Sequence, residues 1–189
     1  MISDETNQII AMHTKNFLLT GPPGSGKTTV IRAVAEGLRD LSPTGFYTAE
    51  IRVRGIRQGF ELVSLEGGRS VLSDARGNHG PIVGKYRVNI EDFEAFLSTL
   101  TFDSSVHRLF IIDEIGKMEC FSLQFRSLVI TLLDSPVPLL ATIPLHGNAY
   151  IEAIKHRNDV EVFLLTRENR DSMADLITEK IRKVIDQIA

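Results

Sequence analysis

Short apolar runs alternate along the chain with segments in which apolar residues recur every three or four positions. The runs have the length and composition of buried strands, and they occupy residues 17–20, 46–51, 108–113, 138–143 and 160–166. Amphipathic helices are predicted between the last two runs and over residues 27–41, 89–100, 121–132 and 177–188. Apolar strands separated by such helices predict a three-layer α/β fold around a mostly parallel sheet.

The middle of the chain has a different pattern. Residues 59–66 and 69–74 are rich in strand-forming side chains and flank the pair Gly67-Gly68. This arrangement is typical of an antiparallel hairpin, which we expect as an addition to the parallel sheet. The stretch 75–85 contains three glycines and is a candidate mobile loop, and residues 86–88 are a candidate short strand.

The composition is that of an ordinary folded protein, with 43% hydrophobic and 24% charged residues. A length of 189 residues predicts one domain over residues 1–189. The net charge of −3 argues against a nucleic-acid partner, and no apolar run has the ~18 residues of a membrane span. The single cysteine, Cys120, and a polar start without a signal pattern predict a cytoplasmic location. No feature identifies a protein partner.

Residues 21–28, GPPGSGKT, match the Walker A pattern G-x-x-x-x-G-K-[ST] between a predicted strand and a predicted helix. Backbone N–H groups of such a loop, together with the positive end of the helix, bind phosphates. We expect Lys27 to reach the β- and γ-phosphates and Thr28 to place its hydroxyl on Mg²⁺. An ordinary turn before a helix is the alternative, and the strand and helix on either side argue against it. The nucleotide-binding residues predicted here are Gly21, Pro22, Pro23, Gly24, Ser25, Gly26, Lys27, Thr28 and Thr29.

Two adjacent carboxylates, Asp113 and Glu114, end the apolar run at 109–112. Open α/β sheets bind ligands at the carboxyl ends of their strands. We expect Asp113 to bind the nucleotide through the Mg²⁺ that Thr28 contacts, and Glu114 to orient or deprotonate an attacking water. A strand that ends in solvated acids is the alternative, and the phosphate loop in the same chain argues against it. Gly116 follows as a further nucleotide-binding candidate.

Three basic side chains are candidates for stabilising the charge that develops during phosphoryl transfer. Lys117 follows the acid pair directly, and a surface lysine is an equally good interpretation. Arg57 belongs to a group of arginines in which a solvated strand edge is the favoured interpretation. Arg170 precedes the last predicted helix, where it is equally well an exposed residue beside a helix cap.

Five blocks together resemble the small P-loop nucleoside-triphosphatases first described from thermophiles. They are TGPPGSGKTT (20–29), GFYTAEIR (45–52), RQGF (57–60), DEIGKME (113–119) and TRENRD (166–171). The resemblance implies a RecA-like core, with an extra strand between those that carry the phosphate loop and the acid pair. It implies slow, Mg²⁺-dependent hydrolysis of nucleoside triphosphates, ATP and GTP among them, to diphosphate and phosphate. By the same resemblance Asp113 matches the metal ligand and Glu114 the catalytic glutamate.

The start of the chain departs from this family, because about 15 residues precede the first predicted strand. Ser3 is a candidate cap for a short helix in this extension.

Two other functions stay open. A nucleotide or small-molecule kinase suits the length and the loop, although residues 75–85 hold only Arg76 and Lys85 where a kinase lid is usually rich in arginine. A nucleotide-gated binding module for RNA or DNA is disfavoured by the negative charge and the lack of a basic–aromatic stripe. The acid pair favours hydrolysis, since an attacking water must be held by a protein group.

Overall fold

A computed structural model describes residues 14–188, so the helix cap predicted at Ser3 lies outside the described residues. The strands span β1 (Asn16–Thr20), β2 (Thr44–Val53), β3 (Ile56–Ser64), β4 (Arg69–Asp74), β5 (Ile82–Val83), β6 (Tyr86–Val88), β7 (Phe110–Ile112), β8 (Leu139–Thr142) and β9 (Val160–Leu164). The helices are α2 (Lys27–Gly37), α3 (Ile90–Leu97), α4 (Leu123–Asp134), α5 (Ala149–Lys155) and α6 (Arg170–Ile188), with short 3₁₀ turns η1 (Arg39–Leu41) and η2 (Glu119–Phe121).

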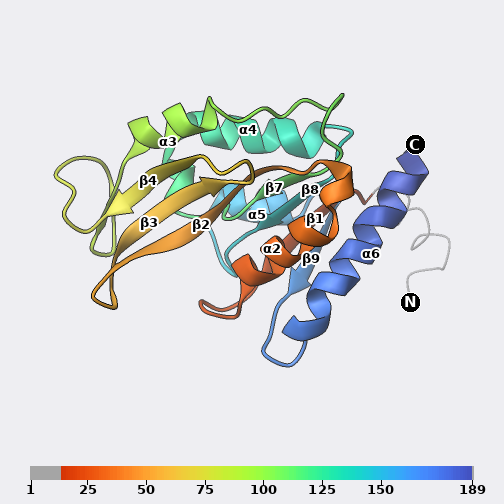
Figure 1. Cartoon of the computed structure of the whole chain (residues 1–189), viewed down its shortest axis with the longest axis horizontal. Helices are drawn as coiled ribbons and strands as arrows, with labels where there is room; N and C mark the ends of the chain where they lie inside the picture. The colour runs from red at the N-terminus through yellow and green to blue at the C-terminus, as the bar shows by residue number, and fades with distance from the viewer. Residues whose placement is uncertain (1–13, 189) are drawn as a thin grey trace.

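The nine strands of residues 14–188 form one sheet in the order β5-β6-β4-β3-β2-β7-β8-β1-β9 (Figure 1). Within the sheet, neighbouring strands of the part β2-β7-β8-β1-β9 are parallel, as the alternation of apolar runs and helices predicted. Strand β8 lies between β1, which leads into the phosphate loop, and β7, which leads into the acid pair. The extra strand of a RecA-like core is thereby confirmed.

Helices cover both faces of the sheet and complete the three layers (Figure 1). Helices α3, α4 and α5 pack on one face, where Phe46, Phe93 and Phe125 form an aromatic centre. Helices α2 and α6 pack on the other face through Ile31, Ile177 and further aliphatic side chains. Alternate residues of β1, β7 and β8 belong to the two cores, which explains the continuous apolar runs of these central strands.

The antiparallel part of the sheet is larger than the sequence predicted. The hairpin around Gly67-Gly68 is confirmed, with Val63 opposite Arg69. A second hairpin joins β2 to β3 through Arg54 and Gly55, whose φ angles of 50° and 79° are typical of a type I′ turn. Strand β2 therefore runs well beyond the predicted 46–51. The candidate loop 75–85 contains β5, which pairs with β6 and ends the sheet.

Helix boundaries also differ from the prediction. The helix expected over 89–100 ends at Leu97, and the helix expected over 177–188 begins earlier, at Arg170. The helix expected over 27–41 ends at Gly37, and Leu41 reaches the core from η1 instead. The helix expected from Phe121 starts two residues later, because the Ser122 hydroxyl caps it by accepting a hydrogen bond of 3.0 Å from the Phe125 N–H. Phe121 belongs to η2 and is 38% exposed.

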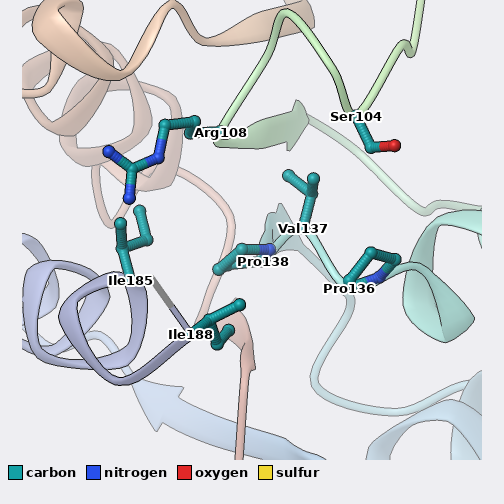
Figure 2. Close-up of a pocket in the computed structure, with 7 residues that line it drawn as sticks. All are labelled: Ser104, Arg108, Pro136, Val137, Pro138, Ile185 and Ile188. Carbon is teal, nitrogen blue, oxygen red and sulfur yellow. The ribbon is translucent and has the colours of Figure 1, made fainter.

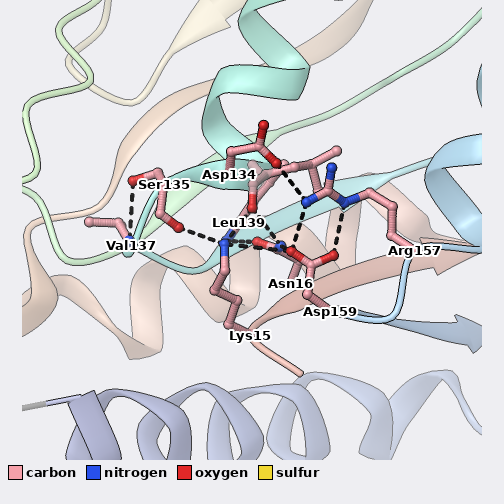
Figure 3. Close-up of polar contacts among 9 residues, drawn as sticks. Lys15, Asn16, Asp134, Ser135, Val137, Leu139, Arg157 and Asp159 are labelled. Atoms are coloured by element: carbon pink, nitrogen blue, oxygen red, sulfur yellow. Dashed lines mark hydrogen bonds and ion pairs between the residues drawn. The ribbon is translucent and has the colours of Figure 1, made fainter. Parts of the chain in front are cut away.

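A polar cluster ties together the amino ends of the parallel strands, at the edge away from the phosphate loop (Figure 3). Asn16, fully buried at the start of β1, donates to the Leu133 carbonyl and accepts from the Leu139 N–H. A cavity of about 270 Å³ opens at the same edge of the sheet (Figure 2). Among residues 14–188, none of the helices is both long and apolar enough to cross a membrane.

Candidate functional site

The phosphate loop joins β1 to α2 in a backbone conformation that depends on glycine. Gly24 and Gly26 have φ angles of 75° and 101°, which side-chain-bearing residues rarely adopt. Gly26 directly precedes the first helical residue, Lys27, and the Ser25 N–H closes a turn onto the Pro22 carbonyl at 3.2 Å. The N–H groups of the first helical turn consequently face the loop, which is the arrangement that binds phosphate.

Lys27 lies over the loop that precedes it. Its ammonium donates hydrogen bonds to the carbonyl oxygens of Gly21 at 3.0 Å and Pro22 at 3.3 Å. Thr28 is half-buried beside it, and Thr29 is exposed. The positive charge of Lys27 also favours the ionised forms of both Asp113 and Glu114, so the loop and the acid pair form one electrostatic unit.

Asp113 follows β7 and is only 2% exposed. Its Oδ1 accepts a 2.5 Å hydrogen bond from the hydroxyl of Thr142, at the end of the neighbouring strand β8. Burial raises the pKa of Asp113, while hydrogen bonds from Thr142 and Thr28 oppose that rise. The second oxygen, Oδ2, is buried and has no hydrogen-bond partner within residues 14–188.

The residues that the sequence predicted as Mg²⁺ ligands meet at this carboxyl. Hydroxyl and carboxylate oxygens are the hard ligands that Mg²⁺ prefers, and Thr28 and the free Oδ2 of Asp113 supply them. The hydroxyls of Thr20 and Ser25 are likewise buried without a partner in the described part of the chain. Buried polar atoms are nearly always satisfied in folded proteins, so these oxygens indicate a polar ligand at this end of the sheet.

Glu114 is half-buried and follows Asp113, to which it is joined by a cis peptide bond. Burial, followed by the negative charge of Asp113, raises the pKa of Glu114. Its side chain lines a cavity of about 200 Å³ together with the exposed Lys117. The other lining residues are Thr48, Phe60, Leu72, Val83, Met118 and Glu119. A raised pKa makes the Glu114 carboxylate a stronger base than an exposed glutamate.

The structure separates the three candidate basic residues. Lys117 borders the cavity that Glu114 lines. The Arg57 guanidinium is held in the antiparallel sheet, where it donates to the Tyr86 hydroxyl at 2.9 Å and pairs with Glu50 at 2.8 Å. Arg170 starts α6 and pairs with its neighbour Asp171 at 3.2 Å.

Two polar residues of this region were missed in the sequence. Thr142 is the last residue of β8, so a polar residue near the carboxyl end of a predicted parallel strand was a usable signal. Glu119 lies in the DEIGKME block but has no local signal of burial, because only the fold reveals that it is 5% exposed. Gly116, a predicted nucleotide-binding residue, is buried and donates its N–H to Glu119.

Comparison with known proteins gives a consistent result. A family model described as NTPase matches residues 16–178. The chain is 39% identical to the nucleoside-triphosphatase THEP1 of Thermotoga sp. (strain RQ2), over 88% of this chain and 95% of that protein. The crystal structure of THEP1 from Aquifex aeolicus superimposes with a TM-score of 0.78 and 34% identity, over 86% of this chain and 96% of that chain. The solution structure of a human cancer-related nucleoside triphosphatase gives a TM-score of 0.76 and 37% identity, over 90% and 98%.

Proposed function

Because the chain belongs to the NTPase family, it is a nucleoside-triphosphate hydrolase, and we propose that it slowly converts several nucleoside triphosphates, including ATP and GTP, to diphosphate and phosphate. The observation that carries the proposal is the acid pair beside the phosphate loop. Lys27 interacts electrostatically with both Asp113 and Glu114, which supports one site in which the loop binds phosphate, Asp113 binds the metal and Glu114 acts as the base.

In this proposal the loop binds the triphosphate and Lys27 supplies a positive charge to its β- and γ-phosphates. Gly24 and Gly26 support this role, because their backbone angles let successive N–H groups face the same concavity. Asp113 and Thr28 would hold Mg²⁺, whose charge neutralises the phosphate oxygens during transfer. The buried, unpartnered Oδ2 of Asp113 supports this assignment.

Glu114 in this proposal orients the attacking water and accepts its proton. The raised pKa of Glu114 supports a role in proton transfer, since a base works best when its pKa approaches the working pH. Lys117 is the preferred candidate for stabilising the developing charge, because it borders the same cavity as Glu114. Arg57 and Arg170 are less suitable, since both guanidinium groups are paired with neighbouring carboxylates.

Release of phosphate from ATP and GTP tests this function, with Glu114→Gln compared with the natural chain. Gln keeps the size of the side chain and removes the base, so we expect turnover to fall at least about 100-fold. Affinity for a fluorescent nucleotide analogue should change less than about threefold, because the phosphate loop is untouched. Glu91→Gln, at an exposed position in the first turn of α3, is the matched control and should keep full turnover.

The same assay separates hydrolysis from phosphoryl transfer to a second substrate. Hydrolysis requires phosphate release without any acceptor and with Mg²⁺ present, and chelation of the metal should abolish it. Persistent turnover in Glu114→Gln would contradict the role of this residue. Release that rises only with one particular acceptor, with stoichiometric transfer to it, would contradict hydrolysis and indicate a kinase.

A further inference from the structure

Two acids line the cavity beside the acid pair, Glu114 and Glu119, and the proposed function assigns a role only to Glu114. Glu119 begins η2, six residues after Asp113, and is 5% exposed. It lines the same cavity of about 200 Å³ as Glu114 and Lys117. Burying a carboxyl destabilises the fold unless the carboxyl is hydrogen-bonded or paired, so the contacts that Glu119 makes beside the proposed base are of interest.

Glu119 fixes the backbone that follows Glu114. Its Oε2 accepts a hydrogen bond of 3.1 Å from the Gly116 N–H, and the Gly116 carbonyl accepts one of 3.1 Å from the Cys120 N–H. Both peptide groups of Gly116 are therefore attached to η2. One residue earlier, the Ile115 N–H donates to the Thr142 carbonyl at 2.8 Å, which attaches the chain to the end of β8.

The two carboxyls converge on Gly116. A Cβ atom added at this glycine would lie 2.7 Å from Oε2 of Glu119 and 3.0 Å from Oε1 of Glu114. Both oxygens thus border the space that a side chain at position 116 would fill, and any larger residue would displace one of them. The Glu119 and Glu114 carboxyls therefore both lie against Gly116, the residue whose backbone Glu119 anchors.

A protonated Glu119 is compatible with this arrangement around Gly116. Burial, and next the charge of Glu114, raise the pKa of Glu119 to about 8. The other titratable groups around it are Asp113, whose charge acts in the same direction, the cavity lysine Lys117, and the Cys120 thiol on η2. A neutral Glu119 accepts the Gly116 N–H without repelling an ionised Glu114.

We propose that Glu119 is a positioning residue for hydrolysis, whose buried carboxyl anchors Gly116 and thereby holds the Glu114 side chain in its productive orientation. The inference rests on the proposed function of Glu114. Misplacing a catalytic group by about 1 Å can reduce turnover by about 100-fold, so a residue that fixes the backbone beside that group has a measurable effect.

Steady-state kinetics of Glu119→Ala and Glu119→Gln test the proposal. Ala removes the acceptor of the Gly116 hydrogen bond, and we expect kcat to fall about 10- to 100-fold while KM and nucleotide affinity change less than about threefold. Gln keeps an acceptor oxygen of the same reach and should retain kcat within about fivefold of the natural chain. Glu91→Ala, at an exposed site on α3, is the control for loss of a glutamate.

The pH profile gives a readout that a merely structural residue would not change. In the natural chain kcat should fall above pH 8, where Glu119 ionises beside Glu114. Gln cannot ionise, so this alkaline decrease should be absent from Glu119→Gln or lie at higher pH. An identical alkaline decrease in the natural chain and in Glu119→Gln would overturn the proposal, even if Glu119→Ala failed to fold.

Unchanged kcat in a folded Glu119→Ala would also overturn the proposal. So would a decrease in kcat that is fully explained by a smaller fraction of folded protein, as measured by thermal unfolding. Glu114→Gln, measured in parallel, separates this failure from failure of the proposed function. An inactive Glu114→Gln with a fully active Glu119→Ala would overturn only the role of Glu119. An active Glu114→Gln would overturn both.

Discussion

At the scale of single residues, the site depends on carboxyls that are buried to different degrees and satisfied by different partners. Asp113 is buried and half-satisfied, since Thr142 binds one oxygen and the other has no partner in residues 14–188. Glu114 is half-buried and faces a cavity. In the proposed function this difference lets Asp113 hold a cation and Glu114 exchange protons with water.

Thr142 is the residue through which the environment of Asp113 can be tested. Thr142→Val keeps the shape of the side chain and removes the hydroxyl, which leaves a buried carboxylate oxygen unpaired. The free energy of unfolding should fall by about 1–3 kcal/mol. The pKa of Asp113 should rise further, so a higher Mg²⁺ concentration should be needed for half-maximal turnover. Titration with Mg²⁺ and urea unfolding measure the two effects. Thr142→Ser restores the hydroxyl and should reverse both, and unchanged Mg²⁺ dependence in Thr142→Val would contradict the assignment.

The buried Glu119 also predicts how stability depends on pH. The folded state raises its pKa from 4.5 to about 8, so the folded protein binds this proton more tightly than the unfolded chain does. The stabilisation is complete below pH 4.5 and is lost as the pH rises to about 8, at roughly 1 kcal/mol for each pH unit. Urea unfolding across this range should therefore show a smaller alkaline loss of stability in Glu119→Gln than in the natural chain. Parallel curves for the two proteins would contradict this prediction.

The sequence revealed those site residues whose signal is local. The phosphate loop and the pair Asp113-Glu114 are short motifs at strand ends, and the local sequence is enough to predict their chemistry. Thr142 acts on Asp113 across 29 positions, because β8 folds between β1 and β7. Glu119 lies in the short turn η2, which has no hydrophobic periodicity from which its position could be predicted. Contacts made by strand order and by irregular turns therefore had to await the structure.

At the scale of elements, the parallel core was predictable and the antiparallel extension was predictable only in part. Buried parallel strands are continuous apolar runs, which stand out in a sequence. The hairpin between β2 and β3 has polar, exposed strand ends, and its turn is Arg54-Gly55, a weaker signal than Asn-Gly or Gly-Gly. Arg52 and Arg57 were interpreted as a solvated strand edge. Both pair with Glu50, Arg57 from across this hairpin and Arg52 from two residues along the same strand.

The polar cluster at the amino ends of the strands should matter for stability and spare the chemistry. Asn16→Ala removes a buried side chain that joins β1 to α4 and β8, and leaves the Leu139 N–H without its acceptor. We expect unfolding in urea to require about 2–4 kcal/mol less free energy, with kcat of the folded protein changed less than about twofold. Asn78→Ala, at an exposed loop position, should cost less than about 0.5 kcal/mol. A loss of kcat in Asn16→Ala at full folding would contradict this division.

At the scale of the whole molecule, the candidate site and a set of stabilising contacts lie at opposite ends of the parallel strands. Its carboxyl edge carries the phosphate loop, Asp113 and Glu114, whose polar groups are held partly unsatisfied. Its amino edge carries the Asn16 cluster and the apolar cavity where the end of α6 meets the segment before β8 (Figures 2 and 3). Burial at the amino edge stabilises the fold, so the opposite edge can keep polar groups available for a ligand.

The last turns of α6 allow this separation to be tested with two isoleucines that the periodic pattern treated as equivalent. Ile185 is 4% exposed and belongs to the core shared with α2, whereas Ile188 is 54% exposed, although both line the cavity of Figure 2. Ile185→Ala should lower the free energy of unfolding by about 2–4 kcal/mol, because it removes buried methyl groups and leaves a void. Ile188→Ala should cost less than about 0.5 kcal/mol, since most of its surface already contacts water. Both variants should keep kcat within about twofold while folded, because neither residue reaches the carboxyl edge. Equal destabilisation by the two substitutions, measured by urea unfolding, would contradict this account of how α6 closes the core.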